Sequence, residues 1–239
     1  MAANGATIAN HTHTHAHLLR KREGESKNAW LDRVEEELTT AQTLIEEHVP
    51  NAPRMLAYPD GEYDPDVLGV VERLDLVAFG QQSGAIGPKL RFSMLPRFPF
   101  GGAYNNLESF KTKVMTLPMP IEPVTANPRV GDDLRPSIEL TFTRDDLRLN
   151  QLVCYTPGGG TAELERNGRT FTVTTTKDVP VGRSRYNCTM PAVDGRFYWF
   201  SQLWIRKTPR GHLVSRTLTP SETSTQGRPG FEGILRRRR

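Results

Sequence analysis

The stretch Met55–Glu62, MLAYPDGE, decides the fold of the N-terminal half, because a short apolar run ends there in a Pro-Asp-Gly turn. A helix is predicted before it, over residues 28–48, with Asn28 as its N-cap and Pro50 after its end. A short helix at about 65–74 and a strand at 76–79 are predicted after it. This alternation of helices and strands is typical of βα units and a parallel sheet. The apolar side chains of the long helix recur every three or four positions, at Trp30, Val34, Leu38, Ala41 and Ile45.

The second half of the chain has a different pattern. Prolines cluster between residues 117 and 136, which predicts a linker at 126–136. Beyond it, short runs rich in β-branched and aromatic residues predict an all-β domain at 137–210, a small antiparallel β-sandwich. Asn167-Gly168 between two of these runs predicts a hairpin. The six predicted strands are residues 137–143, 151–156, 161–166, 170–176, 185–189 and 197–206.

Composition excludes several classes of protein. No apolar run approaches the ~20 residues that a membrane-spanning helix needs, so no transmembrane segment is predicted. The net charge of +4 comes from Arg236–Arg239, and without these four residues 27 basic side chains face 27 acidic ones. A nucleic-acid-binding face is therefore not predicted. Residues 211–239 are expected to be a disordered basic tail.

Two cysteines, Cys154 and Cys188, lie in predicted strands and could face each other across the sandwich. A disulfide between them would fit an exported protein, whereas two buried free thiols are the alternative. The first residues carry neither a basic nor an apolar region of the kind found in export signals. The compartment of this chain is therefore not predicted.

Four of the six histidines lie within seven residues, at His11, His13, His15 and His17. Imidazole is the commonest metal ligand near neutral pH, so the cluster is a candidate divalent-metal site. A solvated His-rich tract and a remnant of an expression tag are the alternatives. The interleaved Thr and Ala residues disfavour the tag, and spacing alone leaves the other two interpretations open.

The run Asn10–Leu18, NHTHTHAHL, resembles the second motif of the polysaccharide deacetylases, the NodB-homology family or carbohydrate esterase family 4. The motif is a His, a Ser or Thr, two further residues and a His. The resemblance implies that His11 and His15 ligate a divalent metal, in most members zinc, and that Thr12 steadies the loop. His13 and His17 are additional to the motif.

The run Leu56–Tyr63 resembles the third motif of that family, with Asp60 in place of the usual Tyr. The resemblance implies that the backbone N–H of Asp60 donates to the oxyanion of a tetrahedral intermediate. It also implies that Tyr58 and Pro59 contact the substrate. Ala57 stands where many members have an arginine.

The resemblance extends over about residues 5–205 and implies an α/β fold: a partial (β/α) barrel of the polysaccharide deacetylase type at 1–125, then the small antiparallel β-sandwich as a C-terminal extension. The first motif of the family, a Thr-Phe-Asp-Asp-Gly strand with the catalytic base and the third ligand, has no counterpart before His11. The similar run Thr141–Asp146 lacks the glycine and lies in the β region. The chain is therefore expected to lack the N-terminal part of a deacetylase.

Two functions follow as expectations. The first is a metal-dependent hydrolase of carbon-nitrogen bonds that removes N-acetyl groups from polysaccharides or oligosaccharides, inactive alone without the Asp-Asp motif. Whether the chain is an enzyme therefore stays uncertain. The second is a noncatalytic glycan-binding or structural module in which the β-sandwich binds sugars through Tyr198, Trp199 and Trp204. Intact relatives are expected to be periplasmic, cell-envelope or secreted proteins.

Overall fold

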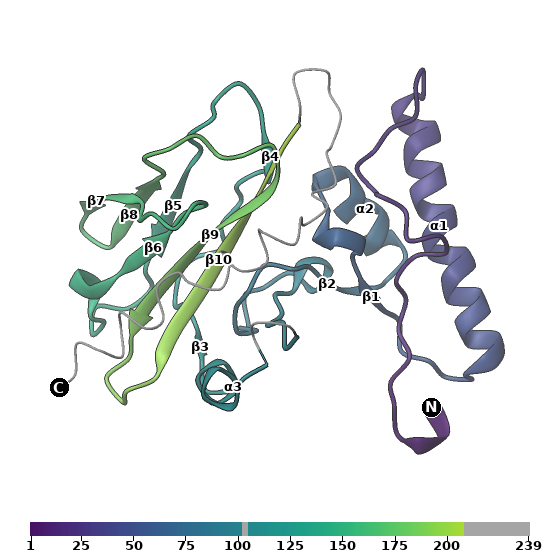
Figure 1. Ribbon diagram of the computed structural model, residues 1–239, viewed down its shortest axis with the longest axis horizontal. Coiled ribbons are helices and arrows are strands. Elements are labelled where there is room, and N and C mark those ends of the chain that lie inside the picture. The colour runs from purple at the N-terminus through teal and green to yellow at the C-terminus, as the bar shows by residue number, and fades with distance from the viewer. Residues whose placement is uncertain (102–104, 208–239) are drawn as a thin grey trace. The chain divides into compact units, whose positions relative to one another are not determined.

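The computed structural model describes residues 1–101 and 105–207, which divide into two compact units (Figure 1). The first unit contains residues 1–82 and 90–97, and the second contains residues 83–89 and those from 98 onward. Within the described residues, three α-helices and several sheets make this a mixed α/β protein. The predicted tail at 211–239 and the end of the predicted 137–210 domain lie outside the described residues.

Helix α1, Lys27–His48, is the long helix that the sequence predicts (Figure 1). Its N-cap is Ser26 and not Asn28, because the Ser26 side chain accepts a hydrogen bond from the backbone N–H of Ala29. Most of the predicted apolar positions are buried, and Ile45 is half-buried. The buried ones are Trp30, Val34, Leu38 and Ala41.

A parallel pair of strands follows in the first unit. Strand β1, Met55–Ala57, pairs in parallel with β2, Val77–Phe79, and helix α2, Pro65–Arg73, connects them. Asp64 caps α2 by accepting from the N–H of Val67 at 2.9 Å, and proline opens the helix, where its missing N–H costs nothing. This is the βα alternation that the sequence predicts.

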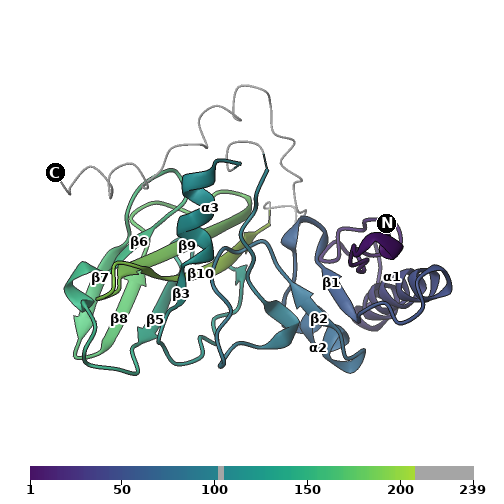
Figure 2. The same ribbon diagram turned by 90° about the horizontal axis from the view of Figure 1, so that it is seen from below.

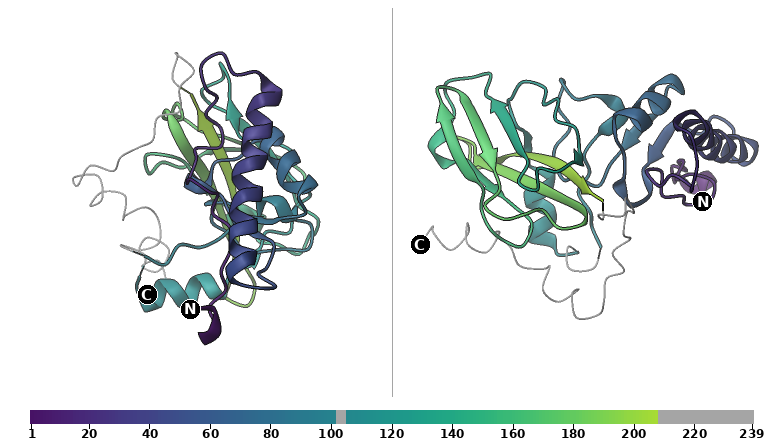
Figure 3. Two further views of the ribbon diagram at one scale, coloured as in Figure 1. Left: turned by 90° about the vertical axis from the view of Figure 1, so that its right-hand side faces the viewer. Right: turned by 90° about the horizontal axis from the view of Figure 1, so that it is seen from above.

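One isolated β-bridge extends this two-stranded sheet on each side. Asn10 bridges to Leu56 of β1, and Leu95 bridges to Phe79 of β2, both in parallel. The N-terminal segment then runs beside α1, as the purple trace in the left view of Figure 3 shows. The first unit is thus a small parallel sheet with α1 and α2 beside it, and it brings residue 10 next to residues 55–57.

The second unit contains two sheets and a short helix (Figure 2). One sheet has the order β3-β10-β9-β6 with β4 also on β10, and the other has the order β5-β8-β7. The hairpin predicted at Asn167-Gly168 joins β7 and β8, with a positive φ at Gly168. The elements are α3 Leu107–Val114, β3 Leu117–Pro118, β4 Arg129–Val130, β5 Ser137–Thr141, β6 Val153–Tyr155, β7 Glu163–Asn167, β8 Thr170–Thr174, β9 Gly182–Pro191 and β10 Phe197–Arg206.

Both sheets of the second unit contribute to one hydrophobic core. The smaller sheet is antiparallel, as predicted, but the larger one is mixed, because β3 and β4 run parallel to β10. Its pattern therefore differs from the purely antiparallel sheets that the sequence suggests. The largest fully buried side chains of the core are Tyr186, Phe142, Leu140 and Met190.

The proline-rich segment does not behave as the predicted linker at 126–136. Strand β4 lies inside it, and the backbone N–H of Ile205 in β10 donates to the carbonyl of Pro128. A proline can accept such a bond although it has no N–H, so short edge strands tolerate it. Met119 and Ile121 of the same region are buried in the core of the second unit.

No helix within residues 1–101 and 105–207 combines the length and the apolar character that crossing a bilayer requires. The short 3₁₀ helices are Ala2–Asn4, Pro59–Gly61, Phe92–Met94 and Leu149–Gln151.

Candidate functional site

Asn10 fixes the start of the histidine loop. Its backbone N–H donates to the carbonyl of Met55 at 2.8 Å, and its carbonyl accepts from Ala57 at 2.9 Å. Its side chain is 1% exposed and donates to the carbonyl of Leu38 in α1 at 2.8 Å. Asn10 therefore ties the loop to both β1 and α1, a role that its place in the motif does not reveal.

The loop closes on itself through Thr12. The N–H of Thr12 donates to the Asn10 side-chain oxygen at 2.8 Å, and the Thr12 hydroxyl accepts from the N–H of Ala16 at 3.2 Å. Thr12 and His15 have φ values of 65° and 58°, in the left-handed region that few residues other than glycine adopt. The Thr12 hydroxyl thus lies where it can steady a strained turn.

Glu37 of α1 holds the middle of the loop. Its carboxylate accepts from the N–H of Thr14 at 2.9 Å and from the Thr14 hydroxyl at 2.7 Å, and its carbonyl accepts from the N–H of His13. Burial alone would raise the pKa of Glu37, but these bonds outweigh it and lower the pKa. Nothing in the helical pattern distinguishes Glu37 from the neighbouring glutamates, so sequence reasoning missed it.

His11 and His15 lie together at the surface of the loop. Their ring centroids are 4.8 Å apart at an interplanar angle of 76°. His11 Nδ1 lies 2.6 Å from the carbonyl of Ala57, which can only accept, so Nδ1 carries the proton and Nε2 has its lone pair free. Metal-ligating histidines are commonly held in this way. The donor chemistry of the pair therefore fits two ligands of a divalent-metal site.

A third ligand for this pair is not found within residues 1–101 and 105–207, where no nearby carboxylate completes it as a three-donor group. This agrees with the absence of a Phe-Asp-Asp-Gly run from the sequence. Three donors do meet at a different set of residues, His17, Asp60 and Glu62.

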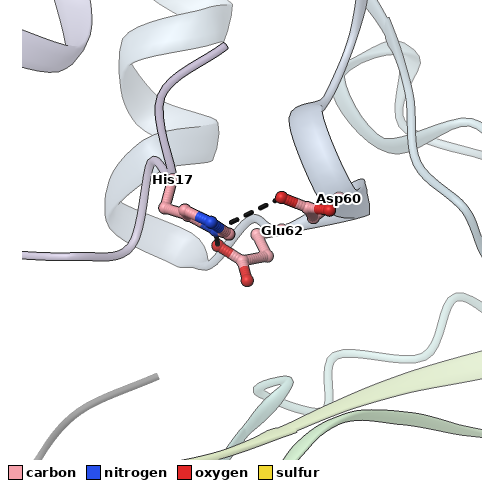
Figure 4. A group of neighbouring side chains, drawn as sticks. All are labelled: His17, Asp60 and Glu62. Atoms are coloured by element: carbon pink, nitrogen blue, oxygen red, sulfur yellow. Dashed lines mark hydrogen bonds and ion pairs between the residues drawn. The ribbon is translucent and has the colours of Figure 1, made fainter. Parts of the chain in front are cut away.

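His17, which the motif leaves without a role, points toward two carboxylates (Figure 4). Its Nδ1 lies 3.2 Å from Asp60 Oδ2 and 3.4 Å from Glu62 Oε2. Glu62 is 6% exposed, and burial raises its pKa although the nearby His17 acts in the opposite direction. These three residues join the histidine loop to the turn at Pro59–Gly61.

Asp60 occupies that turn with a φ of 53°. Two backbone hydrogen bonds close the turn: the N–H of Gly61 donates to the carbonyl of Tyr58, and the N–H of Glu62 donates to the carbonyl of Pro59. The N–H of Asp60 makes no hydrogen bond within the part of the chain that the structure describes. It is therefore free to donate to another group.

Tyr58 and Pro59, predicted to contact the substrate, are both buried. The Tyr58 side chain is fully enclosed, and its hydroxyl donates to the carbonyl of Ser93 at 2.7 Å. Burial raises the pKa of Tyr58 well above its usual value. The aromatic residue of this motif thus supports the turn from inside, and neither side chain is positioned to contact a polysaccharide.

Cys154 and Cys188 form a disulfide in the second unit. They lie directly opposite each other on β6 and β9, neighbouring strands of one sheet, and not across the two sheets. Both cysteines are almost fully buried. The disulfide therefore cross-links two strands that are already hydrogen-bonded neighbours.

The aromatic residues expected to bind sugars lie mostly inward. Trp204 is 3% exposed and packs edge-to-face on Tyr186 in the core. Trp199 is half-buried, and its indole N–H donates to the hydroxyls of Ser83 and Ser201. Tyr198 is half-buried and packs against the same core. No specific observation favours a sugar platform on these residues.

Comparison with known proteins finds a family match that contains both of these motifs. Residues 1–79 match the family model described as polysaccharide deacetylase, and the match contains both the histidine loop and the turn at Asp60. Among curated proteins none matches the chain. The crystal structure of CopC from Methylosinus trichosporium OB3b is similar over 36% of this chain and 91% of the CopC chain, at 12% identity, but its TM-score of 0.27 is too low to support an argument. Residues 1–79 are therefore similar to the polysaccharide deacetylase family.

Proposed function

We propose that this chain is a metal-dependent polysaccharide deacetylase family protein whose substrate class is an N-acetylated amino-sugar glycan. One observation carries the proposal: the hydrogen bond of His11 to the carbonyl of Ala57 joins the histidine motif to the strand that leads into the third motif. The parallel pair β1 and β2 with its flanking bridges supports a partial (β/α) barrel, because such a barrel is built from parallel strands.

His11 and His15 would hold the ion, which we expect to be zinc. A bound zinc ion polarises a carbonyl oxygen and lowers the pKa of a bound water. The N–H of Asp60 would donate to the oxygen of the acetamide as negative charge develops there, and the change from Tyr to Asp leaves this backbone donor in place. The positive φ of Asp60 fixes the direction of the donor before the substrate arrives.

We propose that the described residues do not supply a general base to this site. A positioned base typically contributes ~10² to 10⁴ in rate, and the loss of a carboxylate ligand also loosens the ion. We therefore propose that these 239 residues alone release acetate no faster than the metal ion in solution.

The test measures acetate released from N-acetylglucosamine oligomers by the 239-residue chain with zinc. A second version carries an Asp-Asp-Gly strand of the family fused before Met1, and a third carries the same strand with both aspartates changed to asparagine. Turnover only with the aspartate strand would support the proposal. Chelator-sensitive turnover by the unextended chain that His15→Ala abolishes would refute the proposed inactivity, and no turnover in any version would refute the deacetylase assignment.

A further inference from the structure

Three metal-ligating side chains outside the His11–His15 pair converge in the first unit (Figure 4). His17 comes from the end of the histidine loop, Asp60 from the Pro59–Gly61 turn, and Glu62 from the residue that caps that turn. One ligand atom of each lies within 4.8 Å of the other two. None of the three matches a motif position to which the resemblance assigns a metal ligand.

The distances between these atoms discriminate between a hydrogen-bonded cluster and a set of ligands that share one metal ion. A charge-assisted hydrogen bond between an imidazolium and a carboxylate measures about 2.7–2.9 Å. The observed distances from His17 Nδ1 are longer, 3.2 Å to Asp60 and 3.4 Å to Glu62, and an N–H shared between both oxygens would point directly at neither. Ligands about 2.1 Å from a tetrahedral zinc ion lie about 3.4 Å from one another. The spacing therefore fits shared ligation better than a hydrogen bond.

Among the described residues, the two carboxylates of this group lack a close cationic side chain other than His17. Two carboxylates face one imidazole, and within the described part of the chain neither Asp60 nor Glu62 forms an ion pair with a lysine or arginine. Arg20 is the cation whose charge acts on Glu62 from nearby. The Glu62 side chain is only 8% exposed, so water does little to stabilise its charge. A divalent cation would neutralise both carboxylates.

We infer that His17, Asp60 and Glu62 form a second divalent-cation site, with three donors of its own and none shared with His11 and His15. One imidazole nitrogen and two carboxylate oxygens favour zinc over calcium or magnesium, which prefer oxygen ligands alone. The Asp60 side chain is 42% exposed and that of His17 is 23% exposed, so an ion can enter from solvent. The ion would clamp the histidine loop onto the turn that carries the Asp60 N–H.

The test is calorimetric titration of zinc into the full 239-residue chain. The background is His11→Ala/His15→Ala, which removes the other candidate ligands. In this background we compare the chain with and without Asp60→Asn/Glu62→Gln, changes that keep side-chain size and remove both charges. Glu46→Gln/Glu47→Gln is the matched control, because it also removes two neighbouring carboxylates, both exposed at the end of α1.

We expect one equivalent of zinc to bind in the His11→Ala/His15→Ala background and in its Glu46→Gln/Glu47→Gln control. Asp60→Asn/Glu62→Gln should weaken zinc binding by about tenfold or more, because it replaces both carboxylate ligands with neutral amides and leaves His17 as the one strong ligand. The unfolding midpoint should rise with zinc in the first two proteins only. Circular dichroism without metal checks that every variant folds.

Two results would overturn the inference: no zinc binding in the His11→Ala/His15→Ala background, or equal affinity with and without Asp60 and Glu62. If Asp60→Asn/Glu62→Gln does not fold, His17→Gln replaces it, and unchanged affinity in that variant counts equally against the site. None of these readouts depends on acetate release, so the inference and the proposed deacetylase function fail separately.

Discussion

At the scale of single residues, the motif histidines could be found from sequence, but their surroundings could not. The pattern of His11 and His15 indicates a metal-binding loop, and the structure brings their rings together. The roles of Asn10 and Glu37 depend on partners 28 and 23 positions away, which periodicity does not reveal. His17 likewise meets Glu62 across 45 positions.

Tyr58 allows a test that separates a structural from a substrate-binding role. Tyr58→Phe should lower the free energy of unfolding by about 1–3 kcal/mol, because the carbonyl of Ser93 loses its buried donor. Tyr63→Phe is the matched control, since Tyr63 is also buried but its hydroxyl makes no hydrogen bond within the described residues. Urea denaturation measures both. Weaker glycan binding by Tyr58→Phe at unchanged stability would restore the role predicted from sequence.

Glu25 gives the N-terminal unit an acid sensitivity. Hydrogen bonds from Arg33, two at 2.7 Å, lower the pKa of Glu25 to about 2, against the effect of burial. Because the pKa is lower in the folded state, the stabilisation is complete above about pH 4.5 and is lost as the pH falls toward 2. Glu25→Gln should cost about 1.5–3 kcal/mol at pH 6 and much less at pH 2.

Urea denaturation of the wild type and Glu25→Gln from pH 2 to 7 checks this expectation. Glu23→Gln, an exposed neighbour, is the control and should follow the wild type at every pH. A stability difference between wild type and Glu25→Gln that does not shrink on acidification would show that the Arg33 contact is not the cause.

At the scale of elements, the periodic segments were predictable and the edge strands were not. Helix α1 carries a regular apolar pattern, and the structure places it and strands β5 to β10 within a few residues of the predicted ranges. Strands β3 and β4 are two residues each and lie among prolines, so no pattern marks them. What makes them strands is β10, a ten-residue neighbour whose edge they complete.

The disulfide of β6 and β9 should contribute to stability mainly through the unfolded state. The cysteines are 34 residues apart in sequence, and closing such a loop is worth about 4 kcal/mol in the chain-entropy model. We expect the reduced protein to unfold at lower urea concentration than the oxidised protein, by about that free energy. Mass spectrometry without reduction verifies the bond first. Free thiols in protein made in an oxidising compartment would contradict this expectation.

At the scale of the whole molecule, the division of the chain differs from the one that composition suggests. Prolines mark a change of pattern near residue 126, but the contacts divide the chain between residues 82 and 98. Composition describes local flexibility, whereas a unit is defined by what its buried side chains touch. Ile121 illustrates the difference, because it bridges to Phe142 although it lies on the predicted N-terminal side of the linker.

This division predicts which fragment of the second unit folds. A fragment of residues 98–207 keeps β3, β4, Met119 and Ile121, whereas residues 137–207 lack all four. Burying Met119 and Ile121 contributes about 1.5–3 kcal/mol each. Their loss, with an exposed edge on β10, is comparable to the 5–15 kcal/mol that holds a typical domain together.

We therefore expect the 98–207 fragment to show a cooperative thermal transition by circular dichroism. The 137–207 fragment should melt without cooperativity or aggregate through its uncovered strand edge. Both are prepared oxidised, so that the disulfide is the same in each. If the shorter fragment unfolds as cooperatively and at the same temperature as the longer one, residues 98–136 are not needed by the second unit, and the linker predicted at 126–136 marks the real boundary.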